Sequence, residues 1–169
     1  MLIILFGLAG SGKNFVGEIF HQHPFSFEFM DGDHYLTQEM RDAIASKQSF
    51  TQDMRDQFTE ELIDKISKSN AENLVVASAF YKEKNRQQLL AAFPDAKLIL
   101  IEADLDHIQN RLLERNDIGP DYAKKIKINF EQPIDFHGTI LNNAGKEEVI
   151  EQIETFFPEI KRNQLSIRI

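Results

Sequence analysis

The chain has 169 residues, of which 42% are hydrophobic and 27% are charged, a balance expected of a soluble domain large enough to enclose a core. The net charge of −8 and the lack of a basic block argue against a general nucleic-acid surface, and the absence of cysteine excludes disulfides and thiolate metal sites. No apolar run is as long as a membrane span, and the first expected strand begins at Leu2, which leaves no room for a signal peptide. We therefore expect a cytoplasmic protein.

The most informative stretch is the glycine-rich segment 7–14, which reads G-L-A-G-S-G-K-N. It follows the apolar run 2–6, which predicts a strand, and precedes residues 15–20, which predict a helix. In that setting glycines let the backbone approach a polyphosphate, and the helix dipole favours the negative charge. The alternative is an ordinary glycine turn. The pattern favours a nucleoside triphosphate site, with contacts from Gly7, Gly10, Ser11, Gly12, Lys13 and Asn14.

The residue after the lysine departs from this motif. Asn14 stands where the hydroxyl of Ser or Thr would bind Mg²⁺. An amide oxygen can bind a hard cation, but the longer planar side chain has a different reach. Nucleotide binding therefore follows from the sequence more directly than catalysis does.

Two acidic residues, Asp31 and Asp33, follow the alternating run 25–30, which predicts the second strand. In a parallel sheet the ligand crevice lies beyond the carboxyl ends of the strands, where both carboxylates would fall. They suit one water-mediated contact with Mg²⁺ and one contact with a substrate hydroxyl. The alternative is a polar turn with a capping aspartate.

Two helices are expected over 37–47 and 51–69. The second carries an apolar stripe, spaced every four residues, that we assign to the core: Met54, Phe58, Leu62 and Ile66. Arg55 points either into the substrate cleft or toward surface neighbours, and the sequence leaves both open.

A buried third strand is expected over 73–78, a helix opening in 81–86, and a fourth strand over 97–102. The helix is rich in cations, and a solvated face is the simpler account of Lys82 and Lys84.

Asp104 is expected to cap the next helix, with Leu105, Ile108 and Leu112 buried. Arg111 and Arg115 lie four residues apart on another side, where they either face a phosphate or form an exposed basic face near the helix end. The polar segment 116–130 is predicted to be a mobile lid over the phosphates.

The last expected elements are a fifth strand over 138–142 and an amphipathic helix over 146–157. The helix residues predicted to face inward are Val149, Ile150, Ile153, Phe156 and Phe157. Neither a repeat nor a linker is evident, so residues 1–169 are interpreted as one domain.

Together these motifs resemble the small P-loop kinases that phosphorylate metabolites, including gluconate and shikimate kinases, over nearly the whole chain. The glycine loop and the acidic turn match, residues 50–58 are similar to the gluconate kinase stretch P-L-x-D-x-D-R-x-P-W-L, and residues 77–80 look like C-S-A-L. Arg111 and Arg115 look like the family's R-x-x-x-R before the lid. The resemblance implies a three-layer α/β/α fold with a parallel five-stranded sheet of order 2-3-1-4-5, and ATP and Mg²⁺ as cofactors.

The resemblance also implies roles for individual residues. Asp31 would orient Mg²⁺ through water, Asp33 would bind the acceptor hydroxyl, and Arg55 and Arg86 would hold an acceptor anion. Asn142 and Asn143 fall where such kinases contact adenine, and Arg111 belongs to the same nucleotide site. Lys13, Mg²⁺ and Arg115 would spread the charge that develops during transfer, while Asp33 positions or deprotonates the hydroxyl.

Two departures concern the substrate. The gluconate kinase segment H-P-x-x-N-x-x-K-M reads here as residues 36–44, beginning Leu-Thr and ending Ala-Ile, so its polar substrate contacts are missing. Arg86 also lies one residue further from Ser78 than the family arginine does. The fold carries over from the resemblance, and the substrate does not.

The leading hypothesis is a kinase that acts on a hydroxyl of a small anionic metabolite, as a monomer or homodimer without nucleic-acid or membrane partners. A nucleoside monophosphate kinase is the second, because two convergent arginines, Arg55 and Arg86, would favour a phosphate, whereas one arginine with Asp33 would favour a polyol acid. A third is a nucleotide-binding protein that has lost transfer, which Asn14 supports. Nucleic-acid end phosphorylation is disfavoured by the charge of −8.

Overall fold

The computed structural model describes residues 1–22, 24–115 and 118–160. Five parallel strands form one sheet: β1 (Leu2–Phe6), β2 (Glu28–Asp31), β3 (Leu74–Ala77), β4 (Lys97–Glu102) and β5 (Gly138–Leu141). Their order is β2-β3-β1-β4-β5, which confirms the order implied by the resemblance to the small P-loop kinases. In this register Ile4 of β1 lies between Val76 of β3 and Leu98 of β4.

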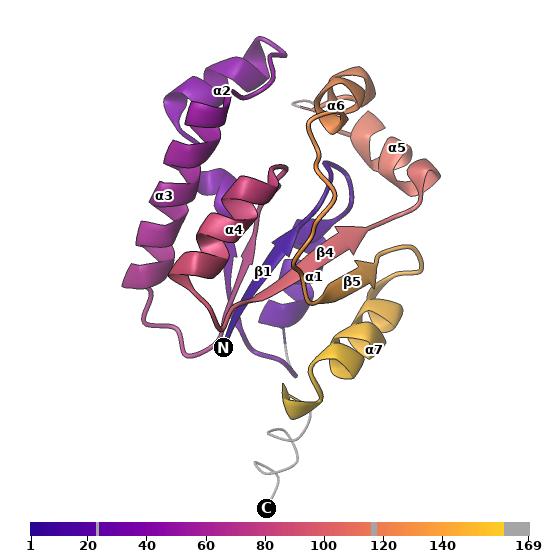
Figure 1. Ribbon diagram of the computed structural model, residues 1–169. Helices are drawn as coiled ribbons and strands as arrows, with labels where there is room; N and C mark the ends of the chain where they lie inside the picture. The colour runs from indigo at the N-terminus through magenta and orange to yellow at the C-terminus, as the bar shows by residue number, and fades with distance from the viewer. Residues whose placement is uncertain (23, 116–117, 161–169) are drawn as a thin grey trace, which may run out of the picture.

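Helices cover both faces of the sheet and give the molecule three layers (Figure 1). They are α1 (Lys13–His21), α2 (Gln38–Ala45), α3 (Gln52–Lys68), α4 (Glu83–Ala92), α5 (Leu105–Leu113), α6 (Pro120–Lys127) and α7 (Lys146–Phe156), with a 3₁₀ turn η1 (Gly32–Tyr35). Side chains alternate along β1, so Ile3 and Leu5 pack with α1 and α7, whereas Ile4 and Phe6 pack with α3 and α4.

Most expected elements are present, and the second strand is the clearest difference. It begins at Glu28 rather than at Phe25. Phe25 and Phe27 are buried as a strand would require, but Ser26 between them has a φ of +57°, which interrupts the extended backbone. Their apolar side chains therefore reach the core from a turn.

Two residues that the sequence assigned to the interior are exposed instead. Leu105 is 59% exposed because the first turn of α5 lies beyond the end of the sheet (Figure 1). Phe156 is 38% exposed, with its ring lying against Gly138 at the edge strand β5. The apolar stripe of α3 is confirmed, since Phe58, Leu62 and Ile66 are buried.

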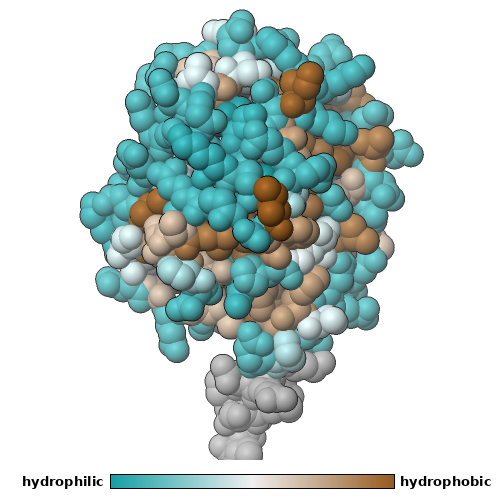
Figure 2. Space-filling view, in the orientation of Figure 1, coloured by the Kyte–Doolittle hydropathy of each residue, from teal (hydrophilic) through white to brown (hydrophobic). Residues whose placement is uncertain are grey.

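Figure 2 shows a face that is largely hydrophilic, with hydrophobic side chains gathered in a band across its middle. Within the part of the chain that the structure describes, no helix is long and apolar enough to cross a membrane.

Candidate functional site

The loop between β1 and α1 contains glycines that leave no space for a side chain. Gly12, which caps α1, has a φ of +92°, and a Cβ there would lie 2.0 Å from the amide nitrogen of Asn142. Gly7 passes so close to β4 that a Cβ would lie 2.3 Å from the carbonyl oxygen of Ile101. Because a glycine cap has no side chain, it leaves the first N–H groups of α1 to an external acceptor such as an anion.

The Ser11 hydroxyl lies inside this loop and is fully buried. Among the described residues it has no hydrogen-bond partner. A buried polar group without a partner costs roughly 1–3 kcal/mol. The hydroxyl, the glycine backbone and the helix N-terminus therefore fit a polyphosphate, whose oxygens would satisfy them.

Lys13, the first residue of α1, turns back over the loop. Its Nζ donates hydrogen bonds to the carbonyl oxygens of Gly7 (3.2 Å) and Leu8 (3.0 Å). Burial lowers the pKa of the ammonium group to about 8, an effect that Asp33 opposes and Arg115 reinforces. The positive charge is therefore costly to maintain here until an anion lies beside it.

Arg111 and Asn142 hold the loop from the side. Arg111 donates through Nη1 to the carbonyl oxygens of Gly10 (3.2 Å) and Ser11 (3.1 Å), and through Nη2 to that of Asn142 (2.8 Å). The buried Asn142 side chain donates through Nδ2 to the same Ser11 carbonyl at 3.0 Å. Both residues lie in the predicted nucleotide site, but their described contacts are with the loop backbone, so they shape it.

The acidic turn is tied to the residue that departs from the motif. Asp31 accepts a hydrogen bond from the backbone N–H of Asp33 (3.0 Å) and another from Nδ2 of Asn14 (2.6 Å). Asp31 is therefore a cap, as one alternative held, and it also lies beside the phosphate loop. An ionised carboxylate only accepts, so the Asn14 amino group faces it and the amide oxygen is directed elsewhere.

Metal binding at this turn is limited by the number of protein ligands. In the described ranges no three His, Asp or Glu residues lie close enough to hold an ion by themselves. Mg²⁺ is commonly held by one or two protein oxygens together with substrate phosphates and water. The oxygens of Asn14 and Asp31 fit that mode of binding.

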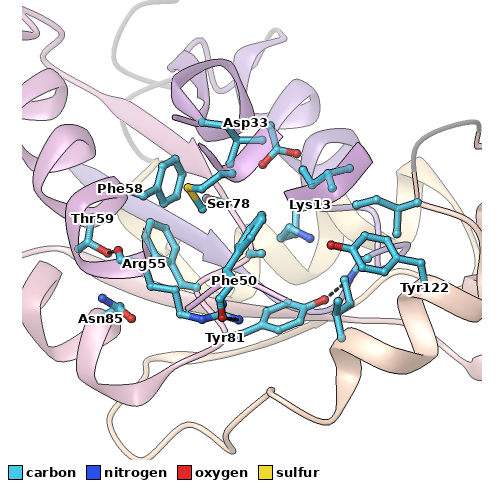
Figure 3. A pocket seen from close by; sticks show the side chains of 18 of the residues that line it. Lys13, Asp33, Phe50, Arg55, Phe58, Thr59, Ser78, Tyr81, Asn85 and Tyr122 are labelled. Atoms are coloured by element: carbon cyan, nitrogen blue, oxygen red, sulfur yellow. Dashed lines mark hydrogen bonds between the residues drawn. The ribbon is translucent and has the colours of Figure 1, made fainter. Parts of the chain in front are cut away.

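A cavity of about 100 Å³ opens beside the loop and is lined by four residues predicted for the site, namely Lys13, Asp33, Arg55 and Arg115. Figure 3 shows Lys13 and Asp33 near one end of it and Arg55 near the other. The sequence did not identify the other lining residues, which include Phe50, Thr59, Ser78, Asn85, Tyr81 and Tyr122. Phe50 and Ser78 did have a signal, because they lie in the segments 50–58 and 77–80 that resemble gluconate kinase.

Arg55 is held among aromatic rings. Its guanidinium carbon lies 5.5 Å from the centre of the Phe50 ring and 5.9 Å from that of Tyr81. One hydrogen bond, from Nη2 to the carbonyl oxygen of Phe50, measures 3.4 Å. Burial lowers its pKa, and among the described residues no carboxylate forms an ion pair with it. Of the two alternatives for Arg55, the structure supports the cleft.

Arg86 lies elsewhere, so its predicted contact with the acceptor needs correction. The side chain is fully buried and does not line the cavity. Its nitrogens donate to Glu83 Oε2 and to the carbonyl oxygens of Phe80 and Glu131, each at 2.8 Å. Arg86 lies in α4, which begins at Glu83. Its guanidinium therefore joins α4 to the segment after α6, through the bond to the Glu131 carbonyl.

The segment predicted as a lid contains α6, and residues 116–117 lie outside the described residues. The described residues of this segment include three that are hydrogen-bonded to the turn between α2 and α3. Tyr122 donates to the Gln48 carbonyl (2.6 Å), Lys125 to the Lys47 carbonyl (2.7 Å) and Asn129 to the Ser49 hydroxyl (3.3 Å). Tyr122 and Ile126 of this segment line the cavity.

Three solved structures share this fold across almost their whole length. A sugar kinase from Janibacter sp. HTCC2649 has a TM-score of 0.78 at 16% identity, with 94% of this chain and 96% of that one covered. A gluconokinase from Sinorhizobium meliloti 1021 has a TM-score of 0.74 at 20% identity, with coverage of 98% and 94%. An APS kinase from Mycobacterium tuberculosis, in complex with AMPPNP and APS, has a TM-score of 0.66 at 15% identity, with coverage of 93% and 96%.

Shikimate kinases are also among the matching structures. No curated protein sequence matches the chain. The family model described as an AAA domain matches residues 2–134, a range that includes the glycine loop, the acidic turn, both arginines Arg111 and Arg115, and α6. The chain therefore belongs to the AAA domain family and has the fold of the small P-loop kinases.

Proposed function

We propose that the protein is an ATP-dependent kinase that transfers the γ-phosphoryl group to a hydroxyl of a small anionic metabolite. We also propose that it does so within one domain, residues 1–169. The observation that carries the proposal is that the phosphate loop and the acidic turn open onto one cavity, which Lys13 and Asp33 line together. The nucleotide analogue bound by the APS kinase of the same fold supports ATP as the donor.

In this account the loop Gly7–Gly12, the Ser11 hydroxyl and Lys13 hold the β- and γ-phosphates. Gly10 has a φ of +83°, as the tight turn requires. Arg111 and Asn142 act as positioning residues, because their donors are bound to the loop backbone. The Asn142 amide nitrogen is thus engaged, and we do not assign it an adenine contact.

Asn14 and Asp31 are the residues that would hold Mg²⁺. When bound there, the ion would supply positive charge to the phosphates and fix their orientation. The protein's part is the hydrogen bond between the two side chains, which aims the Asn14 amide oxygen away from Asp31.

At the acceptor end, Asp33 is placed to orient the hydroxyl and to take up its proton as the new bond forms. Arg55 binds the anionic group of the acceptor, and Arg115 with Lys13 stabilises the negative charge that spreads over the phosphoryl oxygens. The segment 116–130 acts as a lid that keeps water from this reaction.

The nucleoside monophosphate kinase alternative loses its main support, because Arg86 does not join Arg55 in the cavity. The third hypothesis, nucleotide binding without transfer, keeps one specific observation. The Asn14 amide occupies a carboxylate oxygen of Asp31, which a kinase would use to orient the water of Mg²⁺. Measuring phosphoryl transfer to different acceptors distinguishes these two hypotheses from the proposed metabolite kinase.

The test is a coupled ADP-release assay with ATP, Mg²⁺ and a panel of sugar acids, shikimate and nucleoside monophosphates, beside Lys13→Ala and Asp33→Asn variants. Turnover that depends on an acceptor and is lost in both variants supports the kinase. Tight ATP binding without acceptor-dependent turnover, together with a gain of turnover in Asn14→Ser, supports the third hypothesis.

A further inference from the structure

The walls of the acceptor cavity are mainly hydrocarbon. Its lining includes Leu36, Met40, Ile44, Phe58, Phe80 and Ile126. Five segments of the chain supply these side chains, namely the turn before α2, α2, α3, the loop after β3, and α6. An apolar wall built from so many elements is a property of the cavity as a whole and is not confined to one patch.

Three of the uncharged polar side chains that line the same cavity, those of Thr59, Tyr81 and Asn85, already form hydrogen bonds within the protein. The Thr59 hydroxyl donates to the Arg55 carbonyl at 2.7 Å, and the Tyr81 hydroxyl accepts from the Ala9 N–H at 3.0 Å. The Asn85 amide is bonded to side chains of α3, donating to Asp56 at 2.9 Å and accepting from Gln52 at 3.1 Å. An acceptor with many hydroxyls would therefore bury several of them against carbon, and each such hydroxyl is costly.

One feature of the cavity does call for an anion. Arg55 lies among the Phe50 and Tyr81 rings and forms no ion pair with a carboxylate of the described residues. Arginine stays protonated in proteins, so its charge persists in these partly buried surroundings. A carboxylate or phosphate on the acceptor would pair with it in a bidentate way.

The size of the cavity limits the body of the acceptor. Its volume is about 100 Å³. An apolar protein cavity of about 150 Å³ binds benzene. The cavity is therefore smaller than one that encloses benzene, so the body of the acceptor is at most one small ring, with its polar groups at the two ends where Asp33 and Arg55 lie (Figure 3).

From these observations we infer that the acceptor is a small hydroxylated anion with an apolar ring as its body, and not a polyol acid such as gluconate. The inference rests on the proposed kinase function. In the reaction the acceptor oxygen forms a bond to the γ-phosphorus, the bond from that phosphorus to the bridging oxygen breaks, ADP leaves, and the hydroxyl proton passes to the Asp33 carboxylate. Arg55 binds the anionic group at the far end.

The experiment measures the binding of three probes to the full chain by calorimetry, with a non-hydrolysable ATP analogue present. The probes are 4-(hydroxymethyl)benzoate, the uncharged 4-(hydroxymethyl)benzamide, and gluconate; the 3-substituted isomers serve as a second pair. We expect the benzoate of at least one pair to bind about tenfold or more tightly than both its benzamide and gluconate, a difference of ~1.4 kcal/mol or more. Equal or tighter binding of gluconate, or no binding of either benzoate, overturns the inference.

Two variants test whether Arg55 and the apolar wall are responsible for the preference for the benzoate probes. Arg55→Gln is expected to remove the difference between benzoate and benzamide by weakening the binding of benzoate about tenfold or more. Ile44→Gln, at a partly exposed lining position, is expected to weaken the aryl probes and to leave the ATP analogue unaffected. If Arg55→Gln keeps the full preference for benzoate, the anion is bound elsewhere and the inference fails.

The same probes separate this inference from the kinase proposal. ADP release measured with gluconate but not with the aryl probes refutes the apolar acceptor and leaves the kinase standing. Tight binding of an aryl probe without ADP release or phosphorylation refutes transfer, while the binding preference of the cavity remains established.

Discussion

The side-chain amide of Asn14 donates a 2.6 Å hydrogen bond to the carboxylate of Asp31 and so joins the start of α1 to the end of β2. These are the two residues that we assign to Mg²⁺. The bond fixes which end of the amide faces the carboxylate, because an ionised carboxylate cannot donate. Asn14, which replaces the usual Ser or Thr, is therefore hydrogen-bonded to the acidic turn, and the effect of this bond on Mg²⁺-dependent turnover can be measured.

Asn14→Leu removes the amide oxygen and the bond to Asp31 while keeping a side chain of similar size. We expect Mg²⁺-dependent turnover to fall by about tenfold or more, since a charge-assisted hydrogen bond and a metal ligand are lost together. Nucleotide affinity measured without Mg²⁺ should change little, because Asn14 is exposed and the loop does not depend on it. Unchanged turnover at limiting Mg²⁺ would show that Asn14 does not hold the ion.

Lys13 gives the site a dependence on pH. Its pKa is lowered by burial from 10.5 to about 8. The unfolded chain therefore binds more protons than the folded one between these two values, and this residue's contribution to stability rises with pH across that window. Bound phosphates act in the opposite direction, because a nearby anion favours the charged ammonium.

Nucleotide binding above pH 8 should consequently take up a proton and weaken as the pH rises. Calorimetry of a non-hydrolysable ATP analogue, repeated in buffers that differ in ionisation enthalpy, measures this uptake directly. Lys13→Met should bind without the proton uptake. A wild-type protein that binds the analogue with no proton uptake at pH 8.5, roughly half a unit above the lowered pKa, would contradict the assignment of Lys13 to the phosphates.

Tyr122→Phe removes only the hydroxyl that bonds the Gln48 carbonyl at 2.6 Å. One lost hydrogen bond of roughly 1 kcal/mol should open the lid about fivefold more often. We expect a higher KM for the acceptor and faster ATP hydrolysis without acceptor, because water reaches the phosphates. Lys124→Ala, at an exposed position on the same helix, is the control, and an equal effect of both variants would rule out the hydrogen bond as the cause.

Arg86→Met tests whether Arg86 stabilises the fold and does not bind the acceptor. Its guanidinium is fully buried and bonded to Glu83, so removing it leaves a carboxylate without its partner and should cost about 3–5 kcal/mol in the free energy of unfolding. The acceptor KM of the folded protein should not change. Lys84→Met, which breaks an exposed ion pair with Asp56, should cost no more than about 1 kcal/mol. A large rise in KM with unaltered stability would restore Arg86 to the acceptor site.

Sequence patterns locate the ends of strands well, and the site residues at those ends are accordingly the ones the structure brings together. Lys13 and Asp33 follow β1 and β2, which are separated in the sheet by β3 alone, so their proximity follows from topology. Arg55 could be interpreted as a cleft residue or a surface residue, because a helix pattern shows which face is polar without showing what lies opposite. The structure decides this through the rings of Phe50 and Tyr81.

The contacts of Arg86 and Tyr122 show why other features of the site could not be predicted from the sequence. The direction of Arg86 depends on where α4 begins and on the Glu131 carbonyl, 45 residues away in sequence. The contact of Tyr122 with Gln48 spans 74 residues. Neither is signalled by local periodicity or by a motif, since both arise from the packing of segments that are distant in the chain.

The most direct test of the central claim is phosphorus NMR of the protein mixed with ATP, Mg²⁺ and the acceptor that gives the highest ADP release. We expect a new phosphomonoester signal that grows as the γ-phosphate signal declines, and that is absent when Asp33→Asn replaces the wild type. A γ-phosphate converted only to inorganic phosphate, or a phosphomonoester formed equally well by Asp33→Asn, would contradict the central claim.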